Sequence, residues 1–117
     1  MRYVDGFVLP VPKKKLQAYR RMAQKAGKVW RDHGALEYIE CVADDVKPGK
    51  RTSFPQSVKL KKGETVVFAY IEYQSRAHRD RVNAKVMKEM EKTPGFQDMP
   101  FDIKRMAYGG FKVVVGR

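Results

Sequence analysis

Four acidic side chains fall within nine residues near the middle of the chain, and they are the first candidates for chemistry. Residues 33–46 hold no Lys or Arg, and their acids are Glu37, Glu40, Asp44 and Asp45. Because side chains on a strand alternate between its faces, Glu40 and Asp44 are predicted on one face and Glu37 and Asp45 on the other. A carboxylate facing the interior of a sheet can act as a general base, although such acids more often pair with basic neighbours. Glu37 and Glu40 are therefore candidate catalytic residues, with pairing as the structural alternative.

A second candidate for acid–base chemistry stands at the end of a predicted helix. His33 follows Trp30 by three residues and extends the apolar stripe of that helix. Since the C-terminal end of a helix favours a protonated histidine, His33 can cap the last carbonyl groups. The alternative is an acid or base at the mouth of a pocket between helix and sheet, with Trp30 in the pocket wall. The sequence leaves both interpretations open.

Asp5 is a carboxylate on an aromatic strand face, between Tyr3 and Phe7. A carboxylate in such a place is either paired or functional. The partner that we expect is Arg105, at the start of the last predicted strand. As a functional group, Asp5 joins the candidate catalytic residues, and Arg105 and Tyr70 join Trp30 as candidate ligand-binding residues.

The chain carries a strong excess of positive charge, with 25 Lys and Arg against 13 Asp and Glu and a formal net charge of +12. Such a charge raises nucleic acid or another polyanion as a partner. Much of the excess falls on segments predicted as helices, where charged side chains usually form the solvated face. No RNA-binding motif accompanies it, but a lysine triplet opens the first helix, and the linker of residues 46–62 is basic with no acid. The candidate polyanion-binding residues are Lys13, Lys14, Lys15, Lys50, Arg51, Lys61 and Lys62.

Several classes of protein are disfavoured by the composition. Cys41 is the only cysteine, so no disulfide can form within the chain, and its strand position predicts a small buried hydrophobe. The chain has only two histidines, a weak basis for a metal site. No apolar run reaches the ~20 residues that span a bilayer, and the N-terminus does not resemble a signal peptide. We therefore expect a cytoplasmic protein with no metal, no cofactor and no membrane partner.

The elements that must position these residues can be predicted from hydrophobic periodicity. Residues 3–11, 36–44, 64–73 and 105–115 have strand patterns, whereas residues 13–33 and the segment after Ser75 have helical spacing. Ser75 is the predicted N-cap of the second helix, and Gly34 is the predicted stop of the first. The order β-α-β-β-α-β predicts one ferredoxin-like α+β domain over residues 1–117, with a four-stranded antiparallel sheet.

The strand of residues 64–73 is apolar on both faces, with Val66, Phe68 and Tyr70 on one and Val67 and Ile71 on the other. Two helices can cover only one face of a four-stranded sheet. The other face would remain apolar and exposed unless a second copy covered it. The sequence therefore predicts a homodimer in which two sheets pack face to face.

Short stretches spread over nearly the whole chain resemble one family. The matching stretches include residues 3–7, 34–37, 64–68, 99–102 and 108–111. On these stretches the chain resembles the YbaA-like family of uncharacterised bacterial proteins, and the resemblance implies the dimeric α+β barrel superfamily. It implies no reaction. The superfamily includes cofactor-free monooxygenases, isomerases and haem-dependent enzymes, and one fold hosts many chemistries.

Two hypotheses for the function follow. The first is a small organic or anionic ligand held in a pocket between helices and sheet, either by a binding protein or by a cofactor-independent enzyme. The second is an RNA-associated or polyanion-associated module that uses the basic residues. We prefer the first, because the stretches that match the family are rich in acids and aromatic residues.

Overall fold

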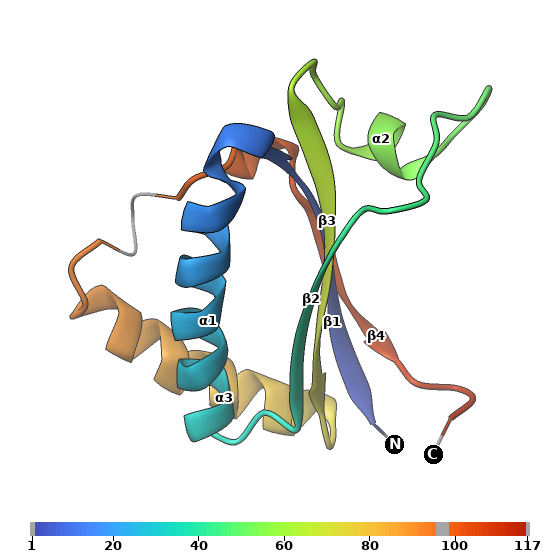
Figure 1. Ribbon diagram of the computed structural model, residues 1–117. Helices are drawn as coiled ribbons and strands as arrows, with labels where there is room; N and C mark the ends of the chain where they lie inside the picture. Colours follow the sequence, from blue (N-terminus) through green and yellow to red (C-terminus); the bar gives the residue numbers. More distant parts are fainter. Residues whose placement is uncertain (1, 96–98, 117) are drawn as a thin grey trace.

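The fold is a four-stranded sheet with two long helices, seen in a computed structural model that describes residues 2–95 and 99–116 (Figure 1). The strands are β1 (Tyr3–Pro12), β2 (Glu37–Val42), β3 (Glu64–Tyr73) and β4 (Ala107–Lys112). The long helices are α1 (Leu16–Asp32) and α3 (Arg76–Glu91). A short helix, α2 (Phe54–Ser57), lies in the linker, and two 3-10 turns, η1 (Lys13–Lys15) and η2 (Ile103–Arg105), precede α1 and β4.

The strands form one antiparallel sheet in the order β2-β3-β1-β4. The central pair, β1 and β3, is in register over ten residues, from Tyr3 opposite Tyr73 to Pro12 opposite Glu64. The element order and the antiparallel pairing confirm the four-stranded architecture predicted from the sequence. The short strands β2 and β4 are the two edges.

The helix boundaries follow from local chemistry. The Ser75 side chain accepts the backbone N–H of His78 at 3.1 Å, so it caps α3 as predicted. Gly34 has a φ of +113°, a conformation that glycine adopts without strain, and it ends α1 as predicted. The α-helix begins at Leu16 rather than at residue 13. The three lysines before it form the 3-10 turn η1, and neither an acid nor a side-chain cap supports an earlier start.

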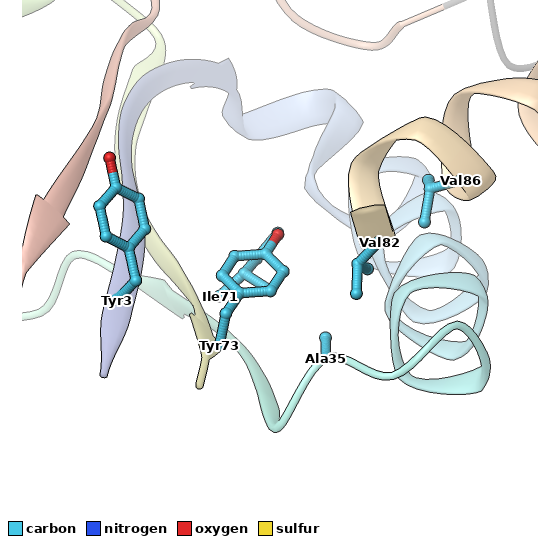
Figure 2. Packing of buried hydrophobic residues seen from close by; sticks show 6 residues of the cluster. All are labelled: Tyr3, Ala35, Ile71, Tyr73, Val82 and Val86. Carbon is cyan, nitrogen blue, oxygen red and sulfur yellow. The ribbon is translucent and has the colours of Figure 1, made fainter. Parts of the chain in front are cut away.

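Both long helices lie on one side of the sheet (Figure 1). The hydrophobic core fills the space between these helices and the sheet. Near α3, the sheet residues Tyr3, Ile71 and Tyr73 pack with Val82 and Val86 of the helix (Figure 2). A second cluster lies near the start of α1 and consists of Leu9, Val11, Tyr19, Ala23 and Val67. The two clusters hold α1 and α3 against the same face of the sheet.

The other face of the sheet, here called the open face, retains exposed apolar side chains. Phe68 of β3 is 42% exposed and Phe111 of β4 is 63% exposed. Phe54 of α2 packs edge-on against Phe68, with ring centroids 6.2 Å apart. Cys41 is exposed, so its predicted burial is wrong: it lies on the open face of an edge strand. Within the described residues, no helix combines the length and the apolar character needed to cross a bilayer.

Candidate functional site

A cavity of about 510 Å³ lies between α1, α3 and the helix-covered face of the sheet. Sheet residues such as Phe7, Leu9 and Ile71 form its floor, and Trp30 of α1 lies in its wall. The wall is predominantly apolar. A volume of this size is within the range of about 300–1,000 Å³ found for small-molecule sites.

Methionine is concentrated around this cavity. The chain contains six methionines, of which Met1 is outside the described residues. The other five all line the cavity: Met22, Met87, Met90, Met99 and Met106. Met87 and Met99 are 47% and 36% exposed, so they lie where the cavity meets solvent. Unbranched, polarizable methionine side chains adapt to ligands of different shape, so this wall can adjust to an apolar guest.

A single carboxylate from the sheet enters this apolar wall. Glu40 of β2 accepts hydrogen bonds from the hydroxyl of Tyr19 and, at 2.6 Å, from the hydroxyl of Tyr38. Burial and, after it, the neighbouring Glu40 raise the pKa of both phenols well above their usual value. Both hydroxyls therefore stay protonated and point their hydrogens at the carboxylate.

The chain brings these three groups together in a simple way. Tyr38 and Glu40 are two residues apart on β2, so both face the helices, and Tyr19 lies on the buried side of α1. Gly27 of α1 makes room for the Tyr38 ring, because a Cβ at that position would lie 2.7 Å from its Cδ1 atom. The absence of a side chain at Gly27 thus allows the ring to reach Glu40.

Trp30 makes its own polar contact away from Glu40. Its Nε1–H donates to the side-chain oxygen of Asn83 at 3.0 Å, and the Tyr73 hydroxyl donates to the same oxygen at 3.1 Å. The Trp30 ring packs beside Tyr38, with centroids 5.8 Å apart. The indole N–H is therefore already used, and the ring itself remains in the cavity wall.

A second hollow, of about 590 Å³, lies between α1 and the edge strand β2. Tyr19, Tyr38 and Glu40 line this hollow as well, so they separate it from the methionine-lined cavity. Basic side chains of α1 lie along it, among them Arg20 and Arg31. Glu40 therefore lies between a hollow with basic side chains and a cavity whose only charged side chains, among the described residues, are acidic.

The predicted ion pair between Asp5 and Arg105 is wrong. Asp5 is 6% exposed and accepts a hydrogen bond from Arg79 Nη1 at 2.6 Å. The register of β1 and β4 places Gly110 opposite Asp5, and Arg105 lies before β4 in the turn η2. Asp5 is therefore a paired core residue, held by a side chain of α3.

Arg105 does not line the cavity, because its guanidinium holds other parts of the chain together. It makes a two-point contact with Glu64, at 2.8 and 2.6 Å, and its Nε donates to Asp102 at 2.9 Å. It also donates to the Lys59 carbonyl at 3.0 Å. The hydrogen bonds from Arg105 are the main cause that lowers the pKa of Glu64. Together with the bond to Lys59, they tie the end of the linker to β3.

The other predicted site residues are scattered. His33 caps α1 through its backbone, while its Nε2 lies 2.8 Å from a Glu89 oxygen on α3, outside both hollows. Glu37 and Tyr70 lie on the open face, as the β2–β3 register requires. Of the candidates for a pocket, only Trp30 and Glu40 line the cavity together.

Residue type and periodicity do not mark Tyr19, Tyr38 or the methionines as site residues. In the sequence, Tyr19 and Met22 belong to the apolar stripe of a helix, and Tyr38 lies two residues before Glu40 on the same face. Their convergence depends on how α1 packs on β2, which periodicity does not give.

The basic residues divide into two groups. The Lys13 backbone N–H donates to the Gly63 carbonyl at 2.9 Å, which brings the lysine triplet next to Lys61 and Lys62 at one end of the sheet. Lys50 and Arg51 lie instead in the linker between β2 and α2. Five of the seven candidate polyanion-binding residues thus belong to one end of the molecule.

Fold and cavity together define a ferredoxin-like α+β protein with a mostly apolar internal cavity. The chain belongs to the family described as "Protein of unknown function (DUF1428)", whose model matches residues 2–103. It is 48% identical over 115 residues to the uncharacterized protein YbaA of Escherichia coli strain K12, with 98% of each chain covered. The same protein of Shigella flexneri gives the same figures. The resemblance inferred from short stretches is thereby confirmed.

A solved structure supports the fold. The dimeric ferredoxin-like protein from an uncultured marine organism superposes with a TM-score of 0.59 at 14% sequence identity, and the match covers 100% of both chains. At this identity the likeness concerns the fold alone.

Proposed function

We propose that this protein binds a small organic molecule in the methionine-lined cavity between α1, α3 and the sheet. The observation that carries the proposal is the gathering of all five described methionines around one space of about 510 Å³. They come from α1, α3 and the segment from residue 99 to β4, so no single helix stripe explains their convergence. Methionine-rich walls are common at surfaces that bind several related apolar partners.

The charge of the wall narrows the class of ligand. From the sequence, either a small organic molecule or an anionic ligand is expected. The charged side chains that line the cavity decide between them, and these are Glu40 and Glu91. Both are acids, so an anion would meet repulsion there and an uncharged or cationic molecule would not. An apolar molecule without negative charge is the ligand that this cavity favours.

Calorimetric titration with phenylbutanol, an uncharged probe, tests the proposal. Ala26 of α1 lines the cavity and is 6% exposed, so Ala26→Leu is expected to fill part of it and weaken binding. Ala84 is exposed on α3, and Ala84→Leu, the matched control, is expected to leave binding unchanged. If the parent chain binds neither phenylbutanol nor its amine analogue phenylbutylamine, or if Ala26→Leu binds phenylbutanol as the parent does, the cavity is not the site.

We also propose that two copies pair through their open faces. The exposed apolar side chains of Phe68 and Phe111 support this arrangement, since a second copy would remove them from water. A further support is that the marine ferredoxin-like protein of the same fold is described as dimeric.

A second candidate function, polyanion binding, is favoured by one observation. The bond from the Lys13 N–H to the Gly63 carbonyl joins two basic segments that are far apart in sequence. Five lysines then lie at one end of the sheet: Lys13, Lys14, Lys15, Lys61 and Lys62. Glu64, which begins β3 beside them, is already paired with Arg105, so it does not offset their charge fully. Binding of a short single-stranded RNA that falls steeply with salt is the expected result for this candidate.

A further inference from the structure

The cavity wall has a charge opposite to that of the chain. The chain has 25 basic and 13 acidic residues, yet among the described residues that line the cavity none is Lys or Arg. Its charged members are Glu40, which faces the interior, and Glu91, at the end of α3. In a chain this basic, a purely acidic wall selects against anions and attracts cations.

The polar side-chain atoms of this wall that remain available to a ligand are oxygen acceptors. The hydroxyl hydrogens of Tyr19 and Tyr38 are directed at Glu40, so each phenol oxygen has lone pairs left to accept a hydrogen bond. Glu40 has further lone pairs, because a carboxylate accepts about four hydrogen bonds. The Trp30 N–H, a donor of the same wall, is used by Asn83. A ligand that meets this group must supply the hydrogens.

Aromatic rings line the same cavity as the carboxylate. The rings of Trp30 and Tyr38 lie 5.8 Å apart at an angle of 37°, and those of Tyr19 and Phe101 lie 5.7 Å apart, edge to face. The faces of such rings carry partial negative charge and attract cations. They also exclude water, which strengthens a charge pair formed inside the cavity.

We infer that the ligand is an organic ammonium ion with at least one N–H and an apolar body. This inference rests on the proposed function of the cavity. The ammonium N–H groups donate to Glu40 and to the phenol oxygens of Tyr19 and Tyr38. The apolar body lies among the methionines and extends toward Met87 and Met99, where the cavity opens. The carboxylate compensates for the water that the ammonium group loses on entering.

Three probes with the same phenyl and alkyl body test this inference. Phenylbutylamine carries a positive charge at pH 7, phenylbutanol is uncharged and phenylbutyrate is negative. By calorimetry the amine is expected to bind about tenfold or more tightly than the alcohol, since a charge-assisted hydrogen bond is stronger than a neutral one. Phenylbutyrate is expected to bind more weakly than both.

The variant Glu40→Gln keeps the shape of the side chain and removes its charge. It is expected to abolish the advantage of the amine, measured as the ratio of the alcohol and amine dissociation constants of the same variant. The matched control is Glu37→Gln, an exposed position on the same strand but on the open face, which is expected to keep the advantage.

The outcomes separate the two proposals. Equal binding of amine and alcohol by the parent chain overturns the ammonium inference and leaves the apolar cavity as the site. Preservation of the amine's advantage in Glu40→Gln also overturns the inference. Failure of all three probes overturns the proposed function as well. If Glu40→Gln does not fold, the comparison of the three probes on the parent chain still decides.

Discussion

The buried pair between Asp5 and Arg79 gives a stability prediction that the structure allows to be worked out. Asp5 is 6% exposed and lies 2.6 Å from Arg79 Nη1, and the Arg79 guanidinium carbon sits 4.9 Å from the centroid of the Tyr3 ring. Arg79→Met keeps most of the aliphatic packing and removes the positive charge. Breaking a buried pair on one side costs about 3–5 kcal/mol, and the lost cation–π contact about 0.5–1 kcal/mol more. We therefore expect the free energy of unfolding to fall by about 3.5–6 kcal/mol, a large share of the roughly 5–15 kcal/mol typical of a domain.

Urea denaturation followed by Trp30 fluorescence measures this loss, and a double variant tests its cause. If most of the loss comes from an uncompensated Asp5, then adding Asp5→Asn to Arg79→Met is expected to recover about 2 kcal/mol. Arg81→Met, at an exposed position of the same helix, is the control and is expected to change stability by less than about 0.5 kcal/mol. A double variant as unstable as the sum of the two single variants would refute this reasoning.

Three further predictions concern other parts of the molecule. Arg105 lowers the pKa of Glu64 in the folded protein. The ion pair therefore stabilises the fold fully above the ordinary pKa of a glutamate, and this contribution is lost as the pH falls through the lowered pKa of Glu64. Arg105→Gln is thus expected to destabilise the protein at pH 7, and urea denaturation should show its deficit shrinking below about pH 4. On the open face, Phe111→Lys is expected to convert the proposed dimer into a monomer, which light scattering would detect as a halved molecular mass. Tyr108→Lys, on the other face of the same strand, is expected to leave the dimer intact. A dimeric Phe111→Lys would contradict the proposed pairing. Glutamine in place of all three lysines of η1 is expected to weaken RNA binding and to reduce its salt dependence, and unchanged binding would remove this end of the sheet from the polyanion candidate.

The architecture could be predicted because local signals and the hydrophobic pattern agree in this chain. The apolar, β-branched and aromatic run of residues 64–73 predicts β3, the helical spacing before Gly34 predicts α1, and Ser75 predicts the start of α3. The exceptions are local. The strand predicted from Arg105 begins at Ala107, because residues 103–105 turn into η2, where the guanidinium binds two carboxylates. Such long-range bonds are not encoded in periodicity.

The candidate site could be predicted only in part. Residue type and predicted position single out Glu40 and Trp30, and both line the cavity. The partner of Asp5 could not be found in the sequence, because Arg79 is 74 positions away and reaches it only once α3 packs beside β1. Cys41 was misplaced because the alternation of a strand does not show which face the helices leave uncovered.

The most direct test of the central claim is an NMR titration that observes isotope-labelled methionine methyl groups while phenylbutylamine is added. The resonances of the five cavity methionines can be assigned by single Met→Leu replacements: Met22, Met87, Met90, Met99 and Met106. If an organic ammonium ion occupies the cavity, these five resonances shift together along one saturating curve in the parent chain, and in Glu40→Gln the same curve requires about tenfold or more amine. Resonances that stay unmoved in the parent chain, or that saturate at the same amine concentration in Glu40→Gln, would contradict the claim.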